Sequence, residues 1–372
     1  MRTKRIALVV SICGALTASA PALAAEQQAG DAIPGRYIVM VEKGHDADDV
    51  ARGRDQLLFD SLNGFAADLD AAQVRALRRS ARVALVEQDQ VVEASATQPI
   101  ASDPWGLDRI DQRTLPLSQS YTYNTTASNV RAYVIDTGIA ITHPEFGGRA
   151  SVGYDALGGN GQDCHGHGTH VAGTIGAATW GVAKAARLIS VRVLNCSGSG
   201  STSGIIAALD WVRVNAIKPA VANMSLGGGF SQALNNATNT LANSGVFVAV
   251  AAGNENRNAC NVSPASAASA YTTAASDRSD RRASFSNYGS CVDAYAPGVS
   301  IRSAWLSGGA NTISGTSMAS PHVAGVAALY KGTFGDASSA TVSSWITTNA
   351  TPDVISRNRT GTPNRLLYKS TL

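Results

Sequence analysis

The 372-residue sequence has little charge and no long hydrophobic run, and each shortage excludes a class of protein. Charged residues make up 15% of the chain and the formal net charge is +3, which is too small to indicate a nucleic-acid binder. The apolar run Ile6–Ala18 is too short to span a bilayer. Internal repeats, low-complexity tracts and coiled-coil patterns are also lacking. The 44% of hydrophobic residues fits a compact α/β domain with a smaller element beside it.

The first 24 residues predict a secretory signal peptide. Met1–Arg5 is basic, Ile6–Ala18 is apolar, and Ala22–Ala24 has the small-x-small pattern of a cleavage site. A membrane anchor is the alternative interpretation. We expect cleavage after Ala24, secretion of the protein, and no membrane partner.

Cysteines are few, and their number agrees with export. Cys13 leaves with the signal peptide, and an even set of four in an exported protein predicts two disulfides with three possible pairings. We favour the neighbours in sequence, Cys164–Cys196 and Cys260–Cys291. Each would close a loop of about 32 residues, worth roughly 3–4 kcal/mol in the chain-entropy model. Buried free thiols are the alternative.

Residues 25–95 predict a small separate domain. Strands are expected at 36–41, 64–69 and 83–87, and helices at 46–59 and 70–78. This alternation in so short a segment is typical of a ferredoxin-like α+β unit. The segment is acidic and the remainder is basic, so electrostatic attraction favours docking of the two.

The rest of the chain predicts an α/β domain with a doubly wound parallel sheet and helices on both faces. Apolar runs typical of buried parallel strands alternate with helical patterns. Strands are expected at 130–135, 188–193, 220–225 and 246–252, and helices at 168–178, 203–216, 231–243 and 318–330. Ligands of such sheets bind beyond the carboxyl ends of the strands.

Three side chains stand where a hydrolytic triad needs them. Asp136 ends a buried strand, His167 begins a helix of small residues, and Ser317 begins a buried helix whose dipole favours negative charge nearby. A serine nucleophile needs a histidine to take its proton and a carboxylate to orient that histidine. A helix-capping serine, a turn aspartate and a structural histidine are the alternative interpretations.

Asn254 is a candidate oxyanion donor. It directly follows a buried strand, and its amide together with the Ser317 N–H could stabilise a developing oxyanion. A plain turn asparagine is the alternative. The row His165, His167 and His170 could also suggest a metal site, but no acidic or cysteine ligand set with zinc spacing completes it.

Three blocks of this sequence resemble the signatures of subtilisin-like serine proteases, in the Asp, His, Ser order known for subtilisin. They are Asp136–Gly138, His167–His170 and Gly315–Pro321. Further blocks narrow the resemblance to the proteinase K group, and among its members to the bacterial aqualysin type. These blocks are Trp105–Leu107, Ser225–Gly229, Ser284–Gly289 and Asp108–Gln112, with the four cysteines.

The resemblance implies an organisation and a maturation route. Residues 25–95 would be an inhibitory and chaperoning propeptide, and residues 96–372 a subtilisin-like peptidase domain acting as a monomer. Cleavage near Ser95–Ala96 would leave the propeptide residues Val91–Ser95 in the substrate groove as a product. The resemblance also supports the two cysteine pairings, and it carries over Asp136, His167 and Ser317 as the triad with Asn254 as oxyanion donor.

The resemblance further implies a peptide-binding groove. An edge segment would receive the peptide as an added strand, so that backbone contacts dominate and side-chain preference is broad. The small residues of the primary pocket would leave it open to large apolar or aromatic groups. The edge segment is Ser197, Gly198, Ser199 and Gly200; the pocket walls are Ser225, Leu226, Gly227, Ala251, Ala252 and Gly253.

Structural calcium is implied in the same way. Asp293 with the carbonyls of Ala268 and Ala270 matches one calcium site, and Asp108, Asp111 and Gln112 match a second. Hard oxygen ligands suit calcium. Plain surface acids are the alternative, and catalysis itself should need no cofactor. One residue departs from the family pattern: His165 stands where relatives usually carry asparagine.

Taken together, the sequence predicts a secreted serine endopeptidase of broad specificity, made as an autoprocessed zymogen. Its partners would be protein and peptide substrates and its own propeptide, without nucleic acid. Activity should rise as His167 loses its proton, which places the working range at neutral to alkaline pH. A secreted esterase and a catalytically silent binding protein on the same fold are the alternatives.

Overall fold

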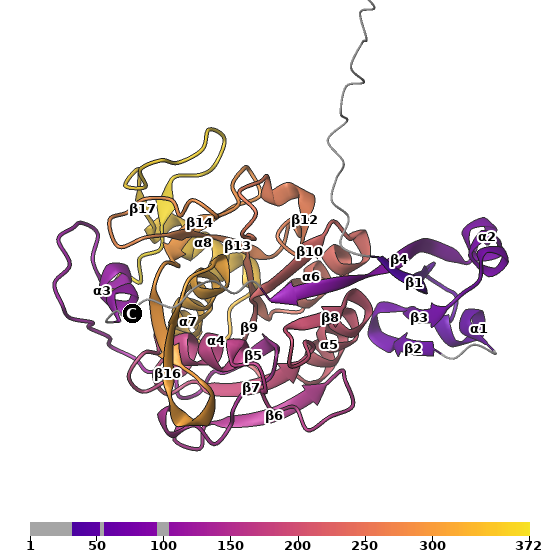
Figure 1. The fold of residues 1–372 in the computed structure, drawn as a ribbon, viewed down its shortest axis with the longest axis horizontal. Helices are drawn as coiled ribbons and strands as arrows, with labels where there is room; N and C mark the ends of the chain where they lie inside the picture. Colours follow the sequence, from indigo (N-terminus) through magenta and orange to yellow (C-terminus); the bar gives the residue numbers. More distant parts are fainter. Residues whose placement is uncertain (1–31, 53–55, 95–103) are drawn as a thin grey trace, which may run out of the picture.

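A computed structural model describes residues 32–52, 56–94 and 104–372. It has a small domain, residues 32–94, that projects from one side of a larger domain, residues 104–372 (Figure 1). The predicted signal peptide and the predicted cut near Ser95 lie outside the described residues.

The small domain is an antiparallel sheet with two helices on one face. Its strands pair in the order β4-β1-β3-β2. The elements are β1 (Ala32–Val41), α1 (Ala47–Ala51), β2 (Gln56–Phe59), β3 (Gly64–Asp68), α2 (Ala71–Arg79) and β4 (Val83–Ala94). Asp70 caps α2 by accepting hydrogen bonds from the backbone N–H groups of Ala72 and Gln73.

One expected element of the small domain is wrong. The helix predicted over residues 46–59 ends at Ala51, and Gln56–Phe59 forms strand β2 against β3. The physical reason is that both faces of this strand are covered by apolar neighbours. Leu58 packs toward α1 and α2, whereas Leu57 and Phe59 pack toward the larger domain, an alternation that suits a strand covered on both sides.

The larger domain is organised around the expected sheet. Its nine strands pair in the order β17-β18-β14-β13-β11-β9-β5-β7-β6, with every pair parallel except β17-β18. The strands are β5 (Arg131–Asp136), β6 (Ala150–Asp155), β7 (Arg187–Arg192), β9 (Ala220–Met224), β11 (Phe247–Ala251), β13 (Tyr271–Ser276), β14 (Ala294–Pro297), β17 (Thr351–Pro352) and β18 (Arg365–Leu366). Shorter strands lie outside it: β8 (Ser199–Ser201), β10 (Leu226–Gly229), β12 (Val262–Ser263), β15 (Ile301–Ala304) and β16 (Ala310–Ile313).

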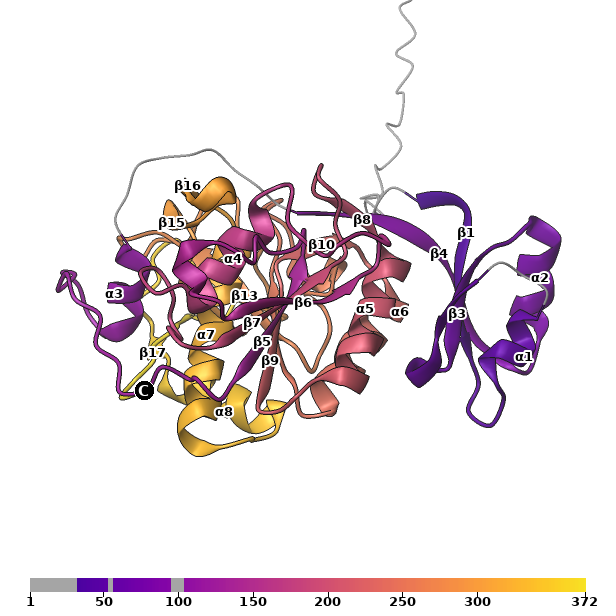
Figure 2. The ribbon, with the colours of Figure 1, turned by 90° about the horizontal axis from the view of Figure 1, so that it is seen from below.

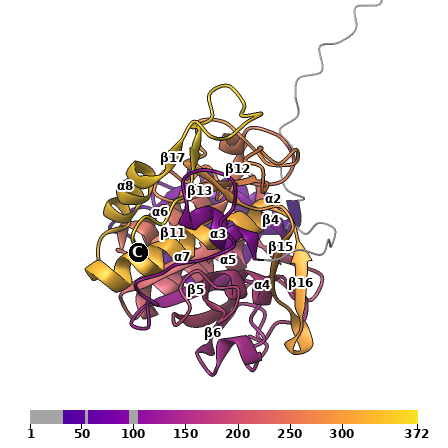
Figure 3. The same cartoon turned by 90° about the vertical axis from the view of Figure 1, so that its left-hand side faces the viewer.

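Helices cover both faces of this sheet (Figure 2). They are α3 (Trp105–Asp111), α4 (His167–Gly176), α5 (Thr202–Asn215), α6 (Gln232–Asn243), α7 (Thr316–Phe334) and α8 (Ser339–Asn349). Alternate residues of β5 divide between the layers: Ala132 and Val134 pack with α4 and α7, and Tyr133 and Ile135 pack with α5 and α6. Figure 3 views the molecule from the side of α3, α7 and α8. Among the residues that the structure describes, no helix is long and apolar enough to cross a membrane.

The small domain docks on α5 and α6 (Figure 2). Ile38, Phe59 and Ala66 of its sheet belong to the same buried apolar cluster as Leu209 and Leu234. The opposite face of that sheet is covered by α1 and α2. The helices α1 and α2 therefore cover one face of the small domain's sheet, and α5 and α6 of the larger domain cover the other.

Both expected disulfides are present. Cys164–Cys196 and Cys260–Cys291 join residues 32 and 31 positions apart, with Cα–Cα distances of 5.0 and 5.3 Å. The first ties the loop before α4, which begins at His167, to the loop before β8, which carries Ser197 and Gly198. The pairings favoured from the sequence are confirmed.

Candidate active site

Asp136 and His167 meet at the carboxyl edge of the sheet, where ligands of such folds bind. Nδ1 of His167 lies 2.7 Å from Oδ1 of Asp136, and both side chains are fully buried. Burial opposes protonation of His167, but the charge and hydrogen bond of Asp136 outweigh it and raise the pKa of His167 above its ordinary value. Nε2 of His167 is buried without a hydrogen-bond partner among the described residues, which leaves it available to a reacting group.

Two glycines allow this close approach of helix and strand. A Cβ on Gly168 would lie 2.2 Å from the carbonyl oxygen of Gly138, so only glycine lets α4 begin against the loop that follows Asp136. Gly166 precedes α4 with a φ of +104°, and a Cβ there would lie 2.4 Å from the Trp305 ring. The small residues around His167 therefore set its distance from Asp136.

Ser317 and Asn254 come together at the N-terminus of α7. Oδ1 of Asn254 accepts hydrogen bonds from the backbone N–H and the hydroxyl of Thr316, at 2.8 and 3.0 Å. Nδ2 of Asn254 is buried without a partner among the described residues, so an amide donor stands free next to Ser317. The hydroxyl of Ser317 donates to the carbonyl of Ser225 at 3.1 Å.

Asp163 supports the site, although the sequence analysis did not single it out. Its carboxylate accepts hydrogen bonds from the hydroxyls of Thr137 and Thr169, at 2.9 and 2.6 Å, and from the N–H groups of His165 and Gly166. It thereby joins the loop after Asp136 to the start of the His167 helix, and its charge contributes to raising the pKa of His167. Its position four residues before His167 was the available signal.

The predicted edge segment forms strand β8 and receives another strand. Residues 91–93 at the end of β4 pair antiparallel with Ser199–Ser201, and residues 93 and 94 pair with Leu226 and Gly227 of β10. β4 thus lies between two strands of the larger domain as an added strand (Figure 1). Ser197 and Gly198 form the turn before β8, in which the Asn195 side chain accepts from the N–H of Ser197.

The predicted pocket walls lie next to these strands. Ala251 ends β11, and the N–H of Gly253 donates to the hydroxyl of Thr316 at 3.1 Å. Gly253 has a φ of +99°, and a Cβ on it would lie 2.3 Å from Nδ2 of Asn287. Ala252 is buried, and Ser225 is joined to Ser317 by two hydrogen bonds. The segments 225–227 and 251–253 therefore border Ser317 and Asn254.

Two carboxylates of β4 contact the N-termini of α5 and α6, a feature that the sequence analysis missed. Asp89 is fully buried and accepts hydrogen bonds from the N–H and the hydroxyl of Ser203, in the first turn of α5. Glu87 accepts from the N–H of Ala233, in the first turn of α6, at 3.2 Å. Helix N-termini attract negative charge, so these contacts hold the small domain on the larger one.

The two predicted calcium sets have different surroundings. The carboxylate of Asp293 accepts from the N–H of Thr272 at 2.7 Å, close in the chain to Ala268 and Ala270, and burial raises its pKa to about 6. No group of three or more His, Cys, Asp or Glu side chains suited to a metal occurs within residues 32–52, 56–94 and 104–372. The His165, His167 and His170 row is not gathered into such a group; Nε2 of His170 lies 3.0 Å from the carbonyl of Ile301.

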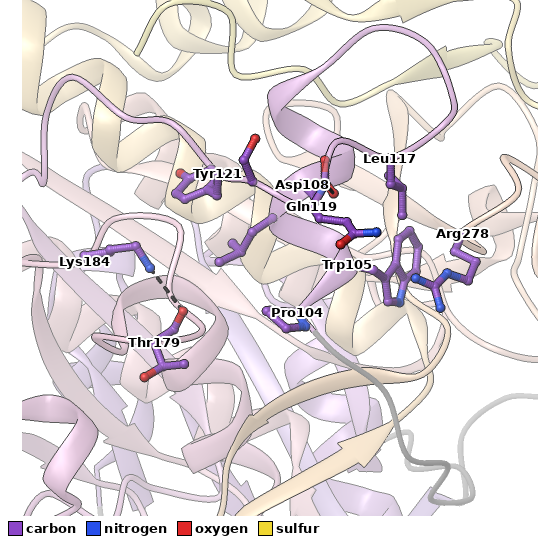
Figure 4. A pocket seen from close by; sticks show the side chains of 11 residues that line it. Pro104, Trp105, Asp108, Leu117, Gln119, Tyr121, Thr179, Lys184 and Arg278 are labelled. Atoms are coloured by element: carbon purple, nitrogen blue, oxygen red, sulfur yellow. Dashed lines mark hydrogen bonds between the residues drawn. The ribbon is translucent and has the colours of Figure 1, made fainter.

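Of the second set, Asp108 lines a pocket of about 490 Å³ beside α3 (Figure 4). None of the triad candidates lines this pocket. Asp108 accepts hydrogen bonds from the N–H and hydroxyl of Ser118, and the Gln112 side chain also accepts from the N–H of Ser118. Asp111 instead pairs with the Lys369 ammonium at 3.0 Å. The structure thus brings Asp108 and Gln112 together, whereas Asp111 forms a salt bridge with Lys369.

Two family models match this chain. One is described as the Subtilase family and matches residues 128–366, and the other as Peptidase inhibitor I9 and matches residues 55–95. The I9 match falls on the small domain and extends through β4, whose end pairs with β8 and β10. The subtilase match contains Asp136, His167 and Ser317.

Individual proteins agree with these models. An extracellular serine proteinase of Thermus sp. (strain Rt41A) is 48% identical over 399 residues, covering 97% of this chain and 96% of that protein. Alkaline serine exoprotease A of Vibrio alginolyticus is 49% identical over 353 residues, covering 93% of this chain and 63% of the relative's length. A solved cold-adapted subtilisin-like serine proteinase is 54% identical with a TM-score of 0.70, covering 72% of this chain and 98% of its own. The chain therefore belongs to the subtilase family: it is a serine endopeptidase made as a zymogen behind an I9 inhibitor segment.

Proposed function

We propose that Ser317, His167 and Asp136 form the catalytic triad with which this secreted enzyme cleaves peptide bonds in protein substrates. The observation that carries the proposal is the buried 2.7 Å contact between His167 and Asp136, which leaves Nε2 of His167 without a partner. His167 takes the proton of the Ser317 hydroxyl as the serine attacks the carbonyl carbon, and returns it to the leaving amine. Water then hydrolyses the acyl-enzyme by the same proton transfers.

An assay with two kinds of substrate tests this proposal against the esterase alternative. The similarity to known proteins gives no support to that alternative. The mature enzyme is incubated with casein and, separately, with a short acyl ester. We expect casein to be degraded to peptides, because loss of the leader exposes the backbone groups of β8 and β10 that pair with β4 in the precursor. Hydrolysis of the ester alone would contradict the proposal.

We expect Asn254→Ala to lower turnover about 10²–10³-fold with little change in KM, a loss that is known from the oxyanion asparagine of subtilisin. The free Nδ2 of Asn254 next to Ser317 would donate to the oxyanion, which exists only after the attack. Steady-state kinetics on a chromogenic peptide measure both constants. Asn258→Ala, an exposed residue four positions further along the same loop, is the control. Equal losses in both variants would indicate a merely structural role.

The pocket walls support a preference for large apolar or aromatic residues before the cut. Serine, glycine and alanine are five of the six residues in the segments 225–227 and 251–253, and the sixth, Leu226, packs in a buried apolar cluster. Backbone pairing of the substrate with β8 and β10 is independent of its sequence, which supports broad specificity otherwise.

The strand pairing of β4 supports an autoprocessed precursor with a cut at Ser95–Ala96. Residues 91–94 occupy the two edge strands in the manner of the acyl half of a cleaved substrate. Residues 25–95 would remain as an inhibitor after the cut, and residues 96–372 would be the mature enzyme. Export would depend on the signal peptide predicted over residues 1–24.

We expect Asp89→Asn to shorten the delay between cleavage and full activity. Hydrogen bonds to a charged group contribute about 1.5–3 kcal/mol, so the affinity of the bound leader should fall about 10–100-fold. The measurement is the appearance of peptidase activity over time in the purified precursor. Asp68→Asn, an exposed carboxylate of the same small domain, should leave the delay unchanged. An unchanged delay in Asp89→Asn would show that this contact does not hold the leader.

Calcium fits the surroundings of Asp293 better than those of the second set. A largely buried carboxylate that meets a backbone N–H, close to the Ala268 and Ala270 carbonyls in the chain, is the oxygen chemistry that calcium prefers. We place the structural calcium there. Asp108 and Gln112 would hold a second ion only if Asp111 left Lys369.

We expect removal of calcium with a chelator to lower the melting temperature of the mature enzyme by about 5 °C. An ion present at 100 times its Kd contributes about 2.7 kcal/mol, and that loss corresponds to such a shift in a domain of this size. In Asp293→Asn the chelator should have much less effect, whereas Asp353→Asn, an exposed control, should respond like the parent enzyme. A full chelator response in Asp293→Asn would contradict the assignment.

A further inference from the structure

A pocket of about 400 Å³ lies next to the loop that carries Asn254, and the triad does not use it. Arginine is the commonest residue in its wall, and a phenylalanine and a valine supply apolar surface. Its lining is Asn256, Asp277, Arg281, Arg282, Ala283, Ser284, Phe285, Val299, Arg357 and Arg359.

The charge of this pocket is only partly neutralised. Asp277 is its one acidic residue, and its carboxylate binds Arg281 at 2.8 Å. Arg282, Arg357 and Arg359 have no salt-bridge partner among the residues that the structure describes. Three guanidinium groups around one cavity are expected to attract an anion.

Arg282 shows that the pocket is built and is not a chance gathering of surface charges. The residue is 8% exposed, and its two terminal nitrogens donate to the carbonyl of Ser286 and to the side chain of Asn256, at 2.5 and 3.0 Å. Its Nε is buried and has no partner among the described residues. A buried donor without an acceptor is costly unless a ligand supplies one.

The pocket is connected to the reaction centre by short hydrogen bonds. The N–H of Asn256 donates to the carbonyl of Phe285 at 2.8 Å, and the N–H of Asn287 donates to the carbonyl of Gly253 at 2.9 Å. These bonds join the pocket wall to both sides of Asn254. The pocket therefore lies beside the oxyanion loop, and none of its residues belongs to β8 or β10, which bind the chain before the cut.

A described residue beyond the predicted cut also contacts this pocket. β4 ends in the groove at Ala94, and the described chain resumes at Pro104. The indole N–H of Trp105, the next residue, donates to the carbonyl of Val299 at 3.2 Å, and Val299 is part of the pocket wall. Trp105, which follows the predicted cut in the chain, therefore contacts the wall of this pocket.

We propose that this pocket binds the carboxylate of an acidic side chain on the leaving side of the substrate, two or three residues after the cut. The inference rests on the peptidase activity proposed above and adds a preference to it. Arg357 and Arg359 would attract the carboxylate electrostatically, and Arg282 would hold it from the buried wall while Phe285 packs against the methylene groups. A small oxyanion such as sulfate shares this chemistry and would compete for the same place.

The experiment uses two quenched fluorescent peptides that are identical except for Glu or Gln at the second and third positions after a single cleavage site. We expect kcat/KM to be about tenfold higher for the Glu peptide, as one charge-assisted hydrogen bond implies. The double variant Arg357→Gln/Arg359→Gln should bring the two peptides to about equal rates. Arg187→Gln is the matched control. This exposed arginine begins β7 and so lies at the amino edge of the sheet, away from the site at the carboxyl edge, and its replacement should leave the ratio unchanged. Sulfate should lower the ratio more than chloride at equal ionic strength.

The outcomes separate this inference from the proposed function. If neither peptide is cut, the proposed function fails. If both are cut at equal rates by the parent enzyme, or if the double variant keeps the preference for Glu, the pocket does not bind an acidic side chain after the cut. The inference is then overturned. If sulfate changes the rates of both peptides equally while their ratio is one, the pocket binds free oxyanions and the substrate assignment is wrong.

Discussion

Replacing Ser317 with alanine should abolish peptidase activity, with a loss in turnover of about 10⁶-fold, the magnitude known for the nucleophile of subtilisin. The change removes one oxygen atom whose hydrogen bond, to the carbonyl of Ser225, contributes little to folding. The variant keeps the Asn254 amide and the groove, so it can still bind a substrate. Without the Ser317 hydroxyl it cannot form an acyl-enzyme. The measurement is turnover of a chromogenic peptide after the leader of the variant has been removed by parent enzyme.

Ser320→Ala is the matched control for this variant. Ser320 lies three residues further along α7, is equally buried, and donates its hydroxyl to the Asn223 side chain at 2.7 Å. It should lose some stability and keep its turnover within a few-fold. If Ser317→Ala kept substantial turnover, or if both variants lost it equally, Ser317 would not be the nucleophile.

Asp136→Asn should lower turnover about 10⁴-fold and shift the pH profile. The charge of Asp136 outweighs the burial of His167 and raises its pKa, and the base is active only after losing its proton. Without that charge burial prevails, so the pKa of His167 falls and the rising limb of the profile moves to lower pH. A pH series of kcat/KM between about pH 5 and 9 measures the shift, because histidine titrates in that range.

Asp155→Asn is the control for the pH series. Asp155 also ends a parallel strand at the same edge of the sheet, but its carboxylate pairs with Arg192 and the N–H of Gly161 and does not contact His167. Its profile should coincide with that of the parent enzyme. A profile for Asp136→Asn that kept the parent midpoint, or a parent profile that was flat, would contradict the role given to the pair.

The sequence predicts most of the candidate catalytic site because each member lies in a short block with its own local signal. Asp136 ends an apolar run, His167 follows a glycine that admits a close helix, and Ser317 begins a helix of small residues. Those local rules bring all three to the carboxyl edge of one sheet. The two disulfides are also predictable from local information. Export and an even number of cysteines leave three possible pairings, and the cysteines that are neighbours in sequence are the ones that pair.

The features that the sequence does not predict depend on contacts between distant segments. Gln56–Phe59 looks helical in isolation and becomes a strand because α5 covers one of its faces. Asp89 is one of many acidic residues in the leader, and only the docked structure shows its carboxylate at the start of α5. Thr316 orients Asn254 from a position 62 residues away.

The intact mass of the purified precursor, beside its Ser317→Ala variant and after incubation with calcium, tests the central claim most directly. The account predicts that the parent chain separates into two fragments with a break at Ser95–Ala96, and that the variant stays whole. Cleavage of both chains at that bond would mean that another protease matures the enzyme. An intact parent chain would contradict the proposed self-cleaving triad.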